Sequence, residues 1–66
     1  MKCSYREYFA NVSQFLKMNK FLKMARIPNG TFSYFMKGSE YDMLISIEKL
    51  ETLKNIIEIK LSEFIE

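Results

Sequence analysis

Apolar residues recur every three or four positions along most of this chain, the spacing that is typical of amphipathic helices. The N-terminal stripe consists of Phe9, Val12 and Leu16. Upstream of it, Ser4 and Glu7 match the S-x-x-E capping box, which marks the start of many helices. The pattern therefore predicts a first helix that begins at Ser4 and ends near residues 14–17.

Residues 18–38 contain two shorter apolar stripes separated by an interruption. The stripes consist of Phe21, Leu22 and Ala25, and of Phe32, Phe35 and Met36. Pro28 disfavours the α conformation at Ile27, but a proline is tolerated at or just before the start of a helix. The stretch predicts one helix that starts at residue 18 or 19, with Asn19 as its cap, a tight turn, and a second helix over residues 29–37.

The C-terminal part reads as a loop over residues 38–44 followed by one long helix over 46–65. No Gly or Pro interrupts this region, and Ser46 is placed to cap the helix. A break near Asn55 into two shorter helices is the alternative. The stripe expected to face the core consists of Leu50, Leu53, Ile57, Leu61 and Phe64.

Three further isoleucines of the long helix, Ile56, Ile59 and Ile65, fall outside that stripe. A second apolar face on a small domain usually marks an interface. We expect a homodimer that buries these three side chains against a second copy. The alternative is a helix that is covered on all sides by its own fold.

The stretch 18–38 resembles the helix-turn-helix of lambda-repressor/Cro-like regulators, whose pattern is L-A-x-x-x-G-[IV]-x-x-x-T-[LIV]-S-x-[FIL]-x-x-G. Residues 27–31 match the I-P-x-G-T form of the turn residue for residue, and Ser33 and Gly38 match further on. Two residues depart from the pattern. Leu22 stands at the usual Ala, and Arg26 stands at a turn Gly that has positive φ, where a side chain costs about 1 kcal/mol.

The resemblance implies a compact all-α domain over residues 1–66, with four helices, or five if the long helix is broken. It also implies a dimeric, sequence-specific DNA-binding regulator or repressor of bacterial, phage or mobile-element origin, with double-stranded DNA as its partner. Four residues of the second helix of the motif would meet base edges: Asn29, Gly30, Ser33 and Tyr34. Five would meet phosphates: Lys17, Lys20, Lys23, Thr31 and Lys37.

The charge distribution agrees with this interpretation. Residues 1–38 hold seven Lys or Arg and one Glu, a net charge of +6, whereas residues 39–66 hold three Lys and seven acids, a net charge of −4. Such asymmetry is expected when one half of a chain meets phosphate.

Composition makes catalysis an unattractive hypothesis. The chain has no His and a single Cys, so no general base of the most common type and no internal zinc site are available. We expect no cofactor, no metal and no small-molecule ligand. No apolar run is long enough to span a membrane and no signal peptide is visible, so we expect a cytoplasmic protein in which Cys3 is a free thiol.

Two other functions fit the same residues. One is an accessory DNA-binding factor of a plasmid or mobile element, such as an excisionase or a relaxosome component. The other is a protein-interaction module, such as an anti-repressor or an inhibitor, because a helix-turn-helix does not guarantee DNA binding. Its contact surface would be aromatic: Tyr5, Tyr8, Tyr34 and Tyr41.

Overall fold

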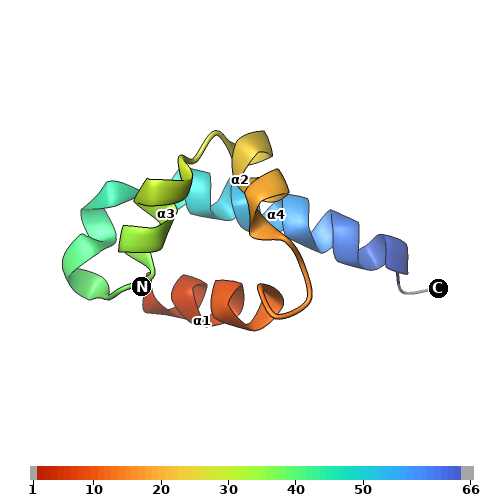
Figure 1. Ribbon diagram of the computed structural model, residues 1–66, viewed down its shortest axis with the longest axis horizontal. Coiled ribbons are helices and arrows are strands. Elements are labelled where there is room, and N and C mark those ends of the chain that lie inside the picture. Colours follow the sequence, from red (N-terminus) through yellow and green to blue (C-terminus); the bar gives the residue numbers. More distant parts are fainter. Residues whose placement is uncertain (1, 65–66) are drawn as a thin grey trace.

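The computed structural model describes residues 2–64, and the side chains of residues 2–63. This part of the chain folds into four α-helices and one 3₁₀-helix, with no strand, so the predicted all-α class is confirmed (Figure 1). The elements in order are α1 (Cys3–Val12), α2 (Met18–Ala25), α3 (Asn29–Phe35), η1 (Ser39–Leu44) and α4 (Ile47–Phe64). No helix of the described residues is both long and apolar enough to cross a membrane.

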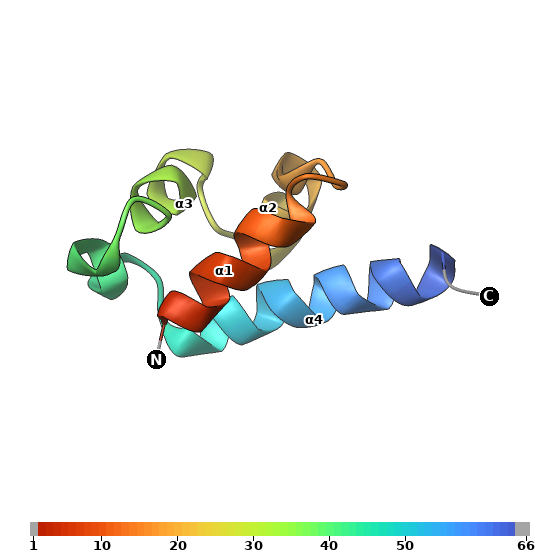
Figure 2. The same cartoon turned by 90° about the horizontal axis from the view of Figure 1, so that it is seen from below.

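The long helix α4 is the base on which the other elements rest. It runs unbroken for 18 residues, so the alternative of a break near Asn55 is wrong. α2 packs on α4, and α3 packs on η1. α3 and η1 lie at the end of the molecule away from the C-terminal end of α4 (Figure 1). The C-terminal half of α4 extends beyond α1 (Figure 2), and this elongates the domain to 39 × 20 × 20 Å.

The core forms where the apolar stripes of the helices meet. Its innermost side chains are fully buried: Phe9, Phe35, Leu50, Leu53 and Ile57. Phe9 has an aromatic neighbour on α3, with its ring centroid 5.7 Å from that of Phe32 in an edge-on arrangement. Burying a side chain of this size stabilises a fold by about 1.5–3 kcal/mol. The predicted stripes of α1 and α2, and that of α4 through Leu61, are therefore confirmed as the source of the core, with Leu16 and Leu61 half-buried at its margin. The side chain of Phe64 lies outside the described residues.

The turn between α2 and α3 has a Schellman geometry. Arg26 has φ 60° and ψ 42°, the left-handed conformation expected at this position. Its N–H donates to the carbonyl of Lys23 (3.2 Å), and the N–H of Ile27 donates to the carbonyl of Leu22 (2.9 Å), which is the bond pattern of this motif. Pro28 is extended, with φ −62° and ψ 143°, so α3 begins directly after it.

Arg6 joins three elements. It extends from α1 to the C-terminal end of α3, where its Nε donates to the carbonyl of Phe35 (2.6 Å) and its guanidinium lies 4.2 Å from the centre of the Phe35 ring. Its Nη2 donates to the carbonyl of Gly38 (2.5 Å) and pairs with the carboxylate of Asp42 in η1. The backbone carbonyl of Asp42 also accepts a hydrogen bond from the Nζ of Lys2 (2.7 Å).

Several predicted helix ends are wrong. The helix α1 begins at Cys3, because the carbonyl of Lys2 already accepts hydrogen bonds from the N–H groups of Tyr5 and Arg6. Ser4 therefore lies inside the helix and the predicted capping box does not form its start. The helix ends at Val12, earlier than expected, and is followed by turns through residue 16.

The other predicted ends differ less. α2 begins at Met18 after an extended Lys17, so Asn19 lies in the first turn and is not the cap. α3 ends at Phe35, two residues early, and the expected loop after it is largely the 3₁₀-helix η1. The cap at Ser46 is confirmed, because its Oγ accepts the N–H of Lys49 (3.3 Å).

We predict that Arg6→Ala destabilises the protein by about 1–3 kcal/mol, since it removes one partner of a partly buried ion pair and the side-chain donor to the carbonyls of Phe35 and Gly38. Arg6→Lys keeps the charge but loses the planar fork, so it recovers only part of this free energy. Urea denaturation measures both, with the exposed Lys23→Ala as the control. A loss below 0.5 kcal/mol for Arg6→Ala would show that the fold does not depend on this contact.

For Arg26→Gly we predict a change in the free energy of unfolding between zero and about +1 kcal/mol, because glycine adopts positive φ without steric strain but has more freedom when unfolded. Arg26→Ala is the matched control, since it removes the long side chain and keeps the strained Cβ. Thermal melts of both variants separate the backbone from the side chain. Clear destabilisation by both changes would mean that the side chain of Arg26 itself makes a stabilising contact.

Tyr8 gives a prediction at alkaline pH. Its hydroxyl is buried without a hydrogen-bond partner among the described residues, and burial, then the charge of Glu58, raises the pKa of Tyr8. A raised phenol pKa contributes stability below the unfolded value near 10, and this contribution is lost as pH rises through the folded pKa. Tyr8→Phe should leave stability unchanged or raise it by about 1 kcal/mol at pH 7.

The same variant should flatten the fall in stability above pH 10. Denaturation midpoints of both proteins between pH 7 and 11 provide the measurement. The assignment fails if Tyr8→Phe loses stability at pH 7 and keeps the full alkaline decline.

Candidate nucleic-acid interface

One face of α3 points to solvent and carries the four residues predicted to meet bases. Asn29, Gly30 and Ser33 are exposed, and Tyr34 is 51% exposed. The opposite face is anchored by Phe35, which is fully buried. Because residues three and four apart share a face of a helix, the burial of Phe35 turns these four positions outward together.

The fold does not need a glycine at Gly30. A Cβ built there meets nothing within 4 Å, and the backbone does not have positive φ. A glycine inside a helix costs stability relative to alanine. The fold therefore does not explain Gly30, and the open space beside its backbone would allow the close approach of another molecule.

Tyr34 is held by two neighbours. Its ring centroid lies 5.6 Å from that of Tyr41 in η1, and the Nζ of Lys37 lies 4.5 Å from the centre of the Tyr34 ring. Both contacts restrict the ring while leaving half of it accessible. Sequence reasoning missed this arrangement because it treated the segment of Tyr41 as a loop.

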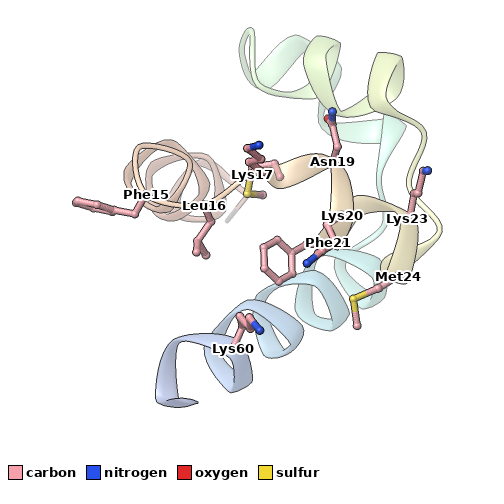
Figure 3. A pocket seen from close by; sticks show the side chains of 10 residues that line it. Phe15, Leu16, Lys17, Asn19, Lys20, Phe21, Lys23, Met24 and Lys60 are labelled. Atoms are coloured by element: carbon pink, nitrogen blue, oxygen red, sulfur yellow. The ribbon is translucent and has the colours of Figure 1, made fainter. Parts of the chain in front are cut away.

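The predicted phosphate-contacting residues divide between two sides of α2. Figure 3 shows that Asn19 and Lys23 point toward α3, whereas Lys20 points toward α4 and Lys60. Lys17 lies just before the first turn of α2 and is exposed. The structure therefore groups Lys23 with the exposed face of α3 and separates Lys20 from it.

The remaining predicted contacts lie at the two ends of α3. Lys37 is exposed just beyond the helix, next to Tyr34. Thr31 is half-buried in the first turn. The helix has no side-chain cap and starts after Pro28, so Thr31 does not cap it.

The three residues predicted to form a dimer interface differ in their surroundings. Ile59 is 63% exposed. Ile56 is half-buried against the core, so it offers less free surface than its position in the sequence suggested. Ile65 lies outside the described residues.

The chemistry of the exposed α3 face is that of contact and recognition. It offers an amide, hydroxyls and lysines, which can donate hydrogen bonds to bases and phosphates, and an aromatic ring. Within residues 2–64, no three His, Cys, Asp or Glu side chains gather in a way that could hold a metal ion. The thiol of Cys3 is exposed and free.

Comparisons of the chain with known protein families, with curated proteins and with solved structures found no match. The resemblance to lambda-repressor/Cro-like regulators therefore rests on residues 18–38 alone.

Proposed function

We propose that this protein binds duplex DNA in a sequence-specific manner through the exposed face of α3 and works as a small transcriptional regulator. The observation that carries the proposal is the outward placement of Asn29, Gly30, Ser33 and Tyr34 on one helix face. A short helix held by a tight turn, with its polar side free, has the form of a helix that enters the major groove. An accessory DNA-binding factor of a mobile element would use the same residues.

The flanking charges support the proposal. Lys23 on α2, which points toward α3, and Lys37, just after α3, are both exposed and are in no ion pair among the described residues. Arg6 does not contribute, because Asp42 and two carbonyls occupy its guanidinium. The cations available to phosphate are thus fewer than the net charge of the N-terminal half suggests.

Dimerisation stays a prediction. Two copies would place two α3 helices on successive turns of DNA, as two-fold operator sites require. Selection of binding sites from random duplex DNA tests both claims, since enrichment of an inverted repeat indicates DNA binding by a symmetric dimer. Failure to enrich any sequence would contradict the proposed function.

On a selected site, Asn29→Ala and Tyr34→Ala should each weaken binding by about 1–3 kcal/mol without loss of stability. Gly30→Ala should leave stability unchanged or raise it slightly and yet weaken binding, because the added methyl group keeps the backbone from the DNA. Gel-shift titrations and thermal melts of the same variants provide the two readouts. Unchanged affinity in all three variants would remove α3 as the recognition helix.

The two lysines of α2 make a matched pair. Lys23→Ala should reduce the slope of log affinity against log salt by about one, the loss of a single phosphate contact, whereas Lys20→Ala should leave it unchanged. The two changes remove the same charge from the same helix, so they differ only in the direction of the side chain that is lost. Equal slopes for the two variants would contradict the placement of the DNA on the α3 side.

A further inference from the structure

An open hollow lies between the turn that follows α1, the helix α2 and Lys60 of α4. It continues between α2 and the C-terminal half of α4 and has two parts, of about 860 and 330 Å³, that share the lining residues Lys20, Phe21, Met24 and Lys60 (Figure 3). Ile56 and Ile59 of α4 complete the smaller part. We call this surface the α2–α4 groove, defined by Phe21, Met24, Ile56 and Ile59.

The α2–α4 groove exposes large apolar side chains. Met24 is 61% exposed and Ile59 is 63% exposed, and Phe15, which lines the far end of the hollow, is 81% exposed. Phe21 beneath them is buried, so the groove continues the core outward. Contiguous apolar surface of this kind usually marks a site of interaction.

The rim of the groove is basic. Lys17 and Lys20 line the hollow, and neither is in an ion pair among the described residues. The acid on the rim, Glu63, is paired with Lys60 at 3.4 Å. The groove thus combines an apolar floor with uncompensated positive charge along the α2 side.

This charge argues against a second copy as the occupant, so a dimer that binds DNA would use a surface other than the one predicted at Ile56 and Ile59. In a two-fold contact the same patch meets itself. Lys20 lines both parts of the hollow, so a two-fold axis through the groove would bring the Lys20 side chains of the two copies near each other, and like charges at an interface are unfavourable. The exposed side chains of the floor, Met24 and Ile59, are not aromatic, which argues against single-stranded nucleic acid, because it binds on aromatic platforms.

The walls of the groove determine the form of the partner. Both walls are helices, whose backbone groups bond internally, so the groove offers no strand edge for an extended peptide. A helical segment satisfies its own backbone and can place apolar side chains on the floor. Carboxylates along its edge would complement Lys17 and Lys20.

We propose that the α2–α4 groove binds an amphipathic helix of another protein, with apolar residues on one face and acidic residues beside them. This proposal does not depend on DNA binding, because no residue of α3 lines the groove. The groove would let the protein hold a protein partner while α3 remains free.

A synthetic helical peptide with Leu along one face and Glu on the other is the probe. Titration of the full chain, followed by NMR, should shift the methyl signals of Met24 and Ile59 before those of Met43. A peptide with the same Leu face and Lys in place of Glu, and a Glu peptide with Ser in place of Leu, should each bind at least about tenfold more weakly.

Variants of the protein test the same contacts. Lys20→Glu and Ile59→Ser should each weaken binding of the Glu peptide by about tenfold or more. The matched controls are Lys37→Glu on the α3 side and Met43→Ser, a 94% exposed apolar residue outside the groove, which should keep the affinity. Circular dichroism of every variant excludes loss of fold as the cause.

Three results would overturn the proposal. Equal binding of the Lys and Glu peptides would show that charge has no part in it. Sedimentation equilibrium that gives a dimer, disrupted by Ile59→Ser, would assign the groove to a second copy. Shifts of the groove methyls by a single-stranded oligonucleotide, with none by the Glu peptide, would assign it to nucleic acid.

Discussion

The contact of Arg6 with the end of α3 is the interaction on which the arrangement of this domain depends. A short helix has few side chains with which to fix its position, and α3 has seven residues. Arg6 supplies the missing constraint, because it bonds the carbonyls of Phe35 and Gly38 and pairs with Asp42. The orientation of the exposed α3 face is thus set from α1, at a distance of about thirty residues along the chain.

The other end of α3 is fixed by the turn. Arg26 adopts the left-handed conformation although it has a side chain, and the buried Ile27 directly after it anchors the chain in the core. From α4, the Nζ of Lys49 donates to the carbonyl of Arg26 (3.2 Å). The strained residue is therefore over-determined by its neighbours, the condition under which a non-glycine residue keeps positive φ.

Patterns local in sequence predicted most of this fold. The stripes through Phe9, Phe35 and Leu50 identified the core, because burial follows helical periodicity. The role of Arg6 could not be predicted, since its partners are carbonyls whose positions depend on the packed fold. The one available signal was that Arg6 lies three residues before Phe9, which places both on the same face of the helix. The exposed side of α3 could be predicted from helical periodicity. The opposite directions of Lys20 and Lys23 could not, because they depend on how α2 packs against α4.

The position of α2 between two surfaces has a thermodynamic consequence. The helix is eight residues long and three of them, Phe21, Leu22 and Ala25, are buried, so it is expected to shift as one body. A molecule in the α2–α4 groove that tilts α2 would move Lys23 and the start of α3 with it. Linkage then requires reciprocity: if the occupant of the groove changes the affinity of α3 for its ligand by some factor, that ligand changes the affinity of the groove for its occupant by the same factor. An eight-residue helix can in this way serve as the coupling element between two binding equilibria.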